Sequence, residues 1–382
     1  MRFSTVASAS VALVASFLVS AAPVRRQANP TDLLVLKFAH VLEQFETQFY
    51  TQAIAKFQET DFIAAGFGNA QVIIEQITNI QIDESIHTTV LQETIIAQGG
   101  TPITSCAFNF DAALTDVATM AATARVVENL GVSAYLGAAH LISDSVLLTA
   151  AGSILTVEAR HQTILNILTQ GSAIPSGFDI AFTPSEVLAI ATSFISECDL
   201  GIPANPTLSI TNTGTVAPGT ALTFSSPALN SSVSTDSLSC QMLVGGAPFA
   251  VVLPMSACVV PDGINGPVAI FVTSDAQPLN NNVRDQATDK LIAGPTMAFI
   301  DTKPEMIGQL ARGGGSSASA SALSTSSTQT ITPAEASALA ASASGSASAP
   351  EATASSSNNV ASGGAASGSI SVSGWASVPK SS

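Results

Sequence analysis

Four short motifs of Glu and His occur in a fixed order in the first half of this 382-residue chain. They are Glu43, Glu84-Ser85-Ile86-His87, Glu128 and Glu158-Ala159-Arg160-His161. Glu and His three positions apart lie on one face of an α-helix, where both side chains can reach the same ion. A four-helix bundle builds a two-metal site when it directs one Glu from each of two helices, and one Glu-x-x-His from each of the others, at its centre. We therefore predict such a bundle here, with these Glu and His residues as its metal ligands.

Helix start and stop signals divide this half of the chain. We expect four long helices at about 31–57, 69–98, 111–141 and 144–170, and a shorter fifth helix at about 183–197. Gly99-Gly100 suits the end of the second helix, and Thr183-Pro184-Ser185-Glu186 has capping-box spacing at the start of the fifth. The links within each pair of helices are short and the link between the pairs is longer, which favours two antiparallel hairpins.

The two predicted hairpins resemble each other. Tyr50 follows Glu43 by seven positions, and Tyr135 follows Glu128 by seven. Each of these helices precedes one that carries Glu-x-x-His. A duplication of this kind places two equivalent half-sites face to face, as a pair of ions requires.

Some neighbouring residues leave alternatives open. Glu46, one turn beyond Glu43, is the other candidate ligand on the first helix, although the spacing to Tyr50 favours Glu43. His40 is either a donor to a ligand or, as we favour, a satisfied buried histidine. We expect His140, near a helix end, to be a capping or surface residue.

The N-terminal residues 1–22 are organised like a secretory signal peptide. Arg2 precedes an apolar run from Val11 to Val19, and Ser20-Ala21-Ala22 offers small residues for cleavage. The run is too short to span a membrane. Arg25-Arg26 matches a dibasic site of the kind that fungal secretory proteases cut, with two solvated charges as the alternative. Residues 23–26 would then be a pro-segment, and we expect a mature protein that is secreted to the extracellular space or cell wall.

The four cysteines suggest two disulfides in a secreted chain. Three pairings are possible, and we favour Cys106–Cys198, which would tie a loop to the end of the helical domain, with Cys240–Cys258. No Cys-x-x-Cys spacing occurs, which disfavours a thiolate metal site.

The charge pattern excludes some classes of partner. The net charge is −15, and after Arg26 the basic residues are scattered singly, so nucleic acid is not an expected partner. A Gly-x-Ser-x-Gly motif is absent before the low-complexity tail and phosphate-loop motifs are absent, which argues against a hydrolase or a nucleotide-binding enzyme.

The composition changes at Gly201, which divides the expected helical bundle (27–200) from a β-rich domain (201–304). Runs such as Val268–Thr273, separated by turn residues, predict a small β-sandwich-like domain. Asn230-Ser231-Ser232 is an N-glycosylation sequon. Residues 305–382 are rich in Ser, Ala and Gly, which predicts a disordered tail. The tail lacks the apolar end of a GPI signal, so no membrane anchor is expected.

The helical half resembles the ferritin-like superfamily. It is most similar to secreted fungal ferritin-like proteins, which are related to plant desiccation-related and fungal stress-response proteins. The stretches that carry the resemblance are Leu42–Tyr50, Asp83–His87, Gly99–Phe110, Glu128–Tyr135 and Glu158–His161. It does not extend firmly over the β-rich domain or the tail.

The resemblance implies roles for particular residues. It assigns the metal ligands to Glu43, Glu84, His87, Glu128, Glu158 and His161. Glu84 and Glu158 would bridge the two ions. Tyr50 and Tyr135 would hydrogen-bond a ligand or accept a radical. The alternative is that both are aromatic residues of the hydrophobic core without a role at the metal site.

Two functions fit these expectations. In the first, two divalent ions of iron or manganese react with dioxygen or peroxide, as in a metal oxidase, a ferroxidase or a manganese catalase. The alternative is a non-enzymatic stress-response or cell-wall-associated protein, whose metal site serves stability or sequestration. Both share the same ligand pattern.

Overall fold

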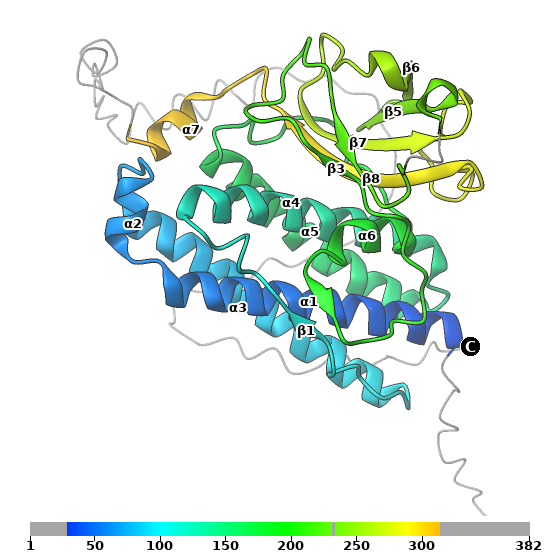
Figure 1. Cartoon of the computed structure of the whole chain (residues 1–382). Coiled ribbons are helices and arrows are strands. Elements are labelled where there is room, and N and C mark those ends of the chain that lie inside the picture. The colour runs from blue at the N-terminus through cyan, green and yellow to red at the C-terminus, as the bar shows by residue number, and fades with distance from the viewer. Residues whose placement is uncertain (1–28, 231–233, 314–382) are drawn as a thin grey trace, which may run out of the picture. The chain divides into compact units, whose positions relative to one another are not determined.

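The computed structural model describes residues 29–230 and 234–313 (Figure 1). The predicted signal peptide, the dibasic segment, two Ser residues of the sequon and most of the predicted tail lie outside the described residues. Asn230 of the sequon is exposed.

Four long helices build the first half of the molecule: α1 (Pro30–Lys56), α3 (Ala70–Ala97), α4 (Val117–Ala138) and α5 (Ser145–Leu168). Each begins after an Asn or Asp whose side chain accepts a hydrogen bond from the first turn, namely Asn29, Asn69, Asp116 and Asp144. In Figure 1, α1 lies along α3 and α4 lies along α5. The predicted fold class, a helical bundle of two hairpins followed by a β region, is confirmed.

Some helix boundaries differ from the expectation. The helix expected from Asp111 begins at Val117, because the Asp116 side chain caps it there. The fifth helix, α6 (Pro184–Ala191), ends before the expected Glu197. Two short elements were not separately expected, α2 (Glu59–Ala64) and the 3-10 helix η1 (Ala139–Leu141).

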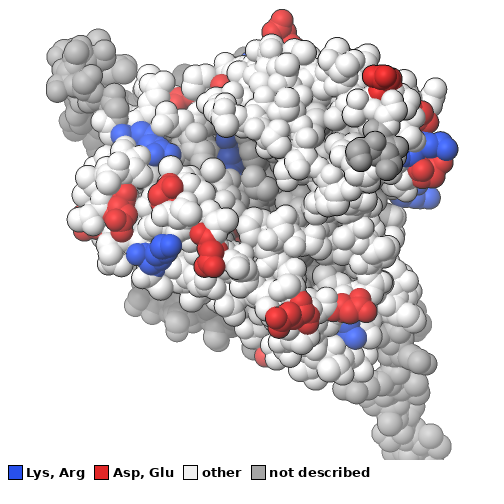
Figure 2. All heavy atoms as spheres, in the orientation of Figure 1, with Lys and Arg blue, Asp and Glu red and all other residues white. Residues whose placement is uncertain are grey.

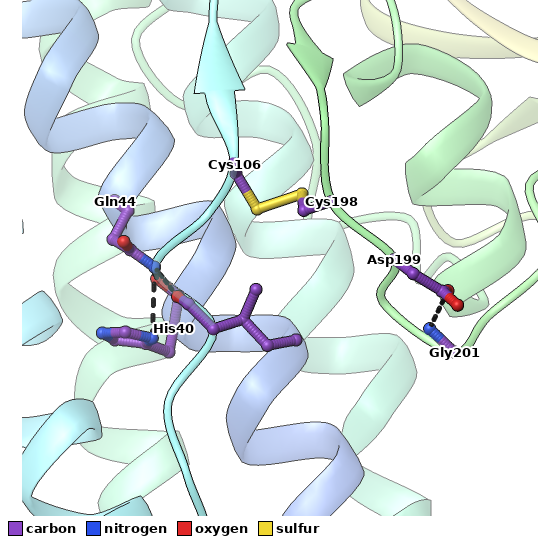
Figure 3. The surroundings of a disulfide bond; sticks show 7 residues. His40, Gln44, Cys106, Cys198, Asp199 and Gly201 are labelled. Carbon is purple, nitrogen blue, oxygen red and sulfur yellow. Dashed lines mark hydrogen bonds between the residues drawn. A yellow bond between two sulfur atoms is a disulfide. The ribbon is translucent and has the colours of Figure 1, made fainter.

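The long link between the hairpins is held on the bundle. It contains β1 (Ala107–Phe108), which pairs with β2 (Ile195–Ser196) after α6. The adjacent Cys106–Cys198 disulfide joins the same two segments (Figure 3). Gln44 of α1 donates its side-chain N–H to the backbone oxygen of Ile103 at 2.9 Å. A second disulfide joins Cys240 and Cys258, so the two predicted disulfides are present.

The β region consists of small antiparallel sheets. The larger has the strand order β6-β5-β7-β8, and the smaller pairs β3 with β4. Their bounds are β3 (Ser209–Ile210), β4 (Phe224–Ser225), β5 (Ser239–Val244), β6 (Val251–Pro254), β7 (Gly266–Thr273) and β8 (Leu291–Ile300), with 3-10 helices η2 (Thr235–Ser237) and η3 (Met255–Ala257) between them.

Strand β7 packs the larger sheet against the helical bundle. Every residue of β7 is buried, and alternate side chains point to opposite faces of a strand. Ala269 and Phe271 belong to a core shared with the helices, where the Phe271 ring lies 6.5 Å from that of Phe182. Val268 and Ile270 belong to a second core on the other face of the sheet. The bundle therefore covers one face of this sheet.

A partly buried ion pair also links the end of the sheet to the bundle. Arg125 of α4 donates to both carboxylate oxygens of Asp301, at 2.7 and 2.8 Å, and its guanidinium lies 4.1 Å from the centre of the Phe299 ring. The chain then continues as α7 (Met306–Ala311), which packs on α5. Helix α7 lies within the range 305–382 that was predicted to be a disordered tail, so the prediction is wrong for these six residues.

The surface in Figure 2 carries few charged side chains, and they are scattered among uncharged ones. None of the helices in the described part is long and apolar enough to cross a membrane.

Candidate metal centre

The six predicted ligands come from the four long helices and meet inside the bundle. Glu43 lies on α1, Glu84 and His87 on α3, Glu128 on α4, and Glu158 and His161 on α5. All are buried, and their exposed fractions run from 0% for three of the Glu residues to 8% for His87. Buried charged groups of this kind need partners or an ion.

The side chains form two overlapping groups that could each hold an ion. One contains Glu43, Glu84, His87 and Glu158, and the other contains Glu84, Glu128, Glu158 and His161. In each group the possible ligand atoms lie within 4.8 Å of one another. Glu84 and Glu158 occur in both groups, which is the arrangement that two bridging carboxylates have.

In the first group, the imidazole of His87 faces three carboxylates. Its Nδ1 atom lies 3.2 Å from Glu43, 3.3 Å from Glu84 and 3.5 Å from Glu158. A single nitrogen cannot satisfy three carboxylates with one proton. A cation bound between them would contact all four groups.

In the second group, His161 is held from both sides. Its Nδ1 atom lies 2.8 Å from Glu84 and 3.3 Å from Glu128. Its Nε2 atom lies 3.2 Å from a carboxylate oxygen of Asp83, whose side chain is 46% exposed. A carboxylate on the outer nitrogen of a metal-binding His fixes the ring orientation and its tautomer.

The donor set fits a pair of divalent ions. Among the described residues, five buried side-chain atoms of the cluster make no hydrogen bond of suitable geometry, although Nδ1 of His161 lies within 2.8 Å of Glu84: Oε1 of Glu84, Oε2 of Glu128, both carboxylate oxygens of Glu158 and Nδ1 of His161. Unpaired buried carboxylates cost several kcal/mol each. Two divalent cations would balance the four ligand carboxylates, and oxygen ligands combined with imidazole suit iron or manganese.

Protons occupy the cluster when no cation balances it. Burial raises the pKa of Glu84 to about 8, and the charge of Glu43 adds to the effect. Burial also raises the pKa of Glu158 well above its usual range. Burial alone would lower the pKa of His161, but the carboxylates of Glu128 and Glu84 outweigh it and raise that pKa to about 11. Metal binding must therefore displace protons.

Two tyrosines connect the half-sites crosswise. Tyr50 of α1 donates its O–H to Glu128 of α4 at 2.5 Å, and Tyr135 of α4 donates to Glu43 of α1. Burial raises the pKa of both phenols well above 10, the usual value, so they remain donors. Each tyrosine thus holds the carboxylate on the opposite hairpin and not the one on its own helix.

Glu46, the alternative on the first helix, lies outside both ligand groups. It is 3% exposed, and burial together with the charge of Glu158 raises its pKa well above the usual range. On the opposite helix, a Cβ atom at Gly131 would lie 2.4 Å from Oε2 of Glu158 and 3.2 Å from Oε1 of Glu46. Because residue 131 is a glycine, the space beside it is free for the carboxylates of Glu46 and Glu158.

The remaining histidines lie outside the ligand groups, although His40 is close enough to Glu43 for the Glu43 charge to act on the pKa of His40. His40 is 1% exposed, and its Nδ1 atom is 3.1 Å from the side-chain nitrogen of Gln44 (Figure 3). Burial lowers the pKa of His40. Its Nε2 atom has no hydrogen-bond partner among the described residues, so the predicted satisfied histidine is satisfied at one ring nitrogen only. His140, in η1, is exposed as expected.

Two residues beside the ligand groups, Asp83 and Gly131, received no role from the sequence alone. Asp83 directly precedes Glu84 in the sequence. Its interaction with His161 can be recognised only when α5 is placed beside α3. Gly131 is a glycine inside a helix, which is a signal of close packing. The crosswise direction of the tyrosine hydrogen bonds depends on how α1 and α4 face each other.

Residues 31–171 match the family model described as the ferritin-like domain. No curated protein matches the chain. The matched range covers α1 to α5, so the chain contains a ferritin-like domain with a buried Glu and His cluster that could hold metal.

Proposed function

We propose that this ferritin-like domain binds two ions of iron or manganese and uses them to react with dioxygen or peroxide. The observation that carries the proposal is the pair of ligand groups that share Glu84 and Glu158. Sharing keeps two ions close enough to act on one small molecule. When bound, such ions can each exchange one electron with an oxidant.

The protein's own residues would keep this site rigid and largely dry. Tyr50 and Tyr135 hold the two unshared carboxylates from opposite hairpins, and Asp83 orients His161. Glu43, Glu84 and Glu158 have exposed fractions of 1% or less, so bulk water is excluded from the ligand oxygens. Fixed ligands in a dry site interact more strongly with a cation than ligands in water do.

A second function is supported by the same burial. The unpartnered oxygens of Glu158 and the raised pKa of Glu84 mean that a cation would stabilise the fold. A metal site of purely structural or sequestering function would give this stabilisation without any reaction.

The first test is metal content combined with reactivity. Wild-type protein reconstituted with Fe(II) or Mn(II) should hold two ions per chain and consume dioxygen or peroxide. Glu84→Gln should lose both ions, because both groups use this carboxylate. Glu93→Gln, an exposed change on the same helix, is the matched control and should keep both ions.

Two results would contradict the proposal in different ways. Equal metal content in Glu84→Gln and Glu93→Gln would mean that the ions bind elsewhere. If two ions bind but react with neither dioxygen nor peroxide, the redox function is wrong and the metal site has a structural or sequestering function.

We also propose that the protein is exported and acts at the cell wall or in the extracellular space. The two disulfides support this, because such bonds persist in oxidising compartments. The resemblance to fungal stress-response proteins suggests that the exported protein acts in a stress response. Recovery from culture medium with an N-terminus near Gln27 would support export, and retention of residues 1–22 on a cell-associated protein would contradict it.

A further inference from the structure

An apolar cavity lies at one end of the bundle, between all four long helices. Its volume is about 50 Å³. The lining includes Val90 of α3 and Ala150 of α5, which are both exposed, so the cavity opens to the surface between these two helices. None of the lining side chains carries a charge.

The two hydroxyl groups in the lining are already satisfied. Thr94 donates its hydroxyl to the backbone oxygen of Val90 at 2.7 Å, and Tyr135 donates to Glu43. A molecule in this cavity therefore meets hydrocarbon walls and no free hydrogen-bond donor.

The inner end of the cavity lies next to the candidate metal centre. Tyr135 lines the cavity and contacts Glu43, a member of the first ligand group. Two other lining residues, Leu91 and Ile154, lie one helical turn from His87 and Glu158 respectively. A single layer of side chains separates the cavity from the ligands.

The other end of the bundle is filled. The interior cavity at that end, which is lined by Ala53, Ile77 and Met120 among others, measures only about 10 Å³, which is at the lower limit for one water molecule. The repeat explains the difference. Equivalent positions are 85 apart in α1 and α4 (Glu43 and Glu128) and 74 apart in α3 and α5 (Glu84 and Glu158).

By this correspondence, two alanines of the open end stand where the filled end has large residues, whereas Leu36 and Phe38 of the open end stand where the filled end has Ala121 and Thr123. Ala134 corresponds to Phe49, and Ala151 corresponds to Ile77. Both alanines line the open cavity, whereas Phe49 and Ile77 are buried in the core at the filled end. The cavity therefore comes from the size of particular side chains and not from the fold as such.

We propose that this cavity is the binding place and access route for dioxygen. Water and peroxide lose hydrogen bonds when they enter an apolar space, which is costly, whereas an apolar diatomic molecule loses none. Apolar cavities in proteins stay dry and bind xenon. The inference rests on the proposed redox function and narrows its oxidant to dioxygen.

Xenon binding to the metal-free full chain tests the cavity without any catalytic step. In xenon-pressurised crystals, or by ¹²⁹Xe NMR, wild-type protein should bind xenon beside Tyr135. Ala151→Ile and Ala134→Phe, which introduce the residues of the filled end, should each reduce xenon occupancy several-fold. Ala122→Phe, on an exposed position of α4, is the matched control. Because Ala134 is buried in a dense core, the half-buried Ala151 keeps the test valid if Ala134→Phe does not fold.

Oxidation kinetics then test the access route. With two ions bound, Ala151→Ile should slow oxidation by dioxygen by roughly fivefold or more, but should leave oxidation by peroxide nearly unchanged. An absence of xenon in the wild type, or an unchanged dioxygen rate in a variant that has lost xenon, would overturn the inference alone. Xenon binding in a metal-loaded protein that reacts with neither oxidant would overturn the redox function and, with it, the assignment of dioxygen.

Discussion

The α1/α3 and α4/α5 hairpins bring equivalent candidate ligands to the centre but differ in the residues around them. Glu46 on α1 corresponds to Gly131 on α4, and Asp83 on α3 corresponds to Val157 on α5. One hairpin thus adds two carboxylates that the other lacks. The comparison shows that the ligand set is symmetric, whereas the space and the hydrogen bonds around it are not.

The asymmetry has a simple packing logic. Glu46 lies close to the backbone of Gly131 and to the carboxylate of Glu158. A side chain at 131 equivalent to Glu46 would compete for the same volume, and protein interiors have no spare volume of that size. A Glu at one position therefore requires a very small residue at its counterpart.

The largest expected effect comes from filling the space at Gly131. In Gly131→Ala the new methyl group would stand 2.4 Å from Oε2 of Glu158. Because Glu158 belongs to both ligand groups, both ions should bind more weakly, and overpacking should cost about 1–3 kcal/mol of stability. Metal titration and thermal unfolding measure the two effects.

Gly152→Ala is the matched control for this change, because no atom lies within 4 Å of a Cβ at that α5 position. It should leave metal affinity unchanged. Equal affinities for Gly131→Ala and the wild type would show that Glu158 can move away without loss, and that the packing contrast between the hairpins has no role in metal binding.

An intermediate effect is expected at the second point of difference. Asp83→Asn should weaken the hydrogen bond to His161 and lower the affinity of one ion by about 10–100-fold, while the ion beside His87 is less affected. Titration with Mn(II), followed by electron paramagnetic resonance, would separate the two binding steps. If both steps weaken equally, Asp83 supports the site as a whole and the half-sites are equivalent.

The smallest effect is a pH dependence of the metal-free protein. The pKa of Glu84 is about 8 in the fold and 4.5 ordinarily, so the folded state binds more protons than the unfolded state between these values. The free energy of unfolding should therefore fall by about 1 kcal/mol or more as pH rises through this window. The pKa of His161, raised to about 11 from 6.5, extends the same trend upward.

Metal binding should reverse this trend, because ions compete with the protons on the same groups and bind more tightly as pH rises. The difference in Tm between loaded and metal-free protein should increase from pH 5 to pH 8. Metal-free protein that becomes more stable over this range would contradict the raised pKa of Glu84. Glu84→Gln should remove that residue's share of the dependence.

The helices of the bundle were predictable because their signals are local. Capping residues lie within a few positions of the backbone groups that they satisfy, as Asp144 does for α5. The start of α4 was misplaced because the turn residues after Phe110 continue the apolar pattern, while only Asp116 caps the helix. The extent of α6 was overestimated because residues after Ala191 pair with β1, a partner distant in sequence.

The candidate site was predictable only in part. The spacing of Glu84 and His87 places both on one helix face, and the repeat suggests which residues are equivalent. The choice between Glu43 and Glu46 remained open, since both lie on the inner face of α1. Their different contacts come from α4, where Tyr135 holds one and Gly131 accommodates the other.

The amino-acid sequence by itself determined the helical bundle, the order of the ligands and their duplication, because helix periodicity and capping act over a few residues. The tertiary structure decided which tyrosine holds which carboxylate, that Asp83 reaches His161, and that an apolar cavity lies beside Tyr135. These features depend on the distances between helices and on the volumes of side chains that are far apart along the chain. Close packing therefore decides how two nearly equivalent hairpins come to have different surroundings.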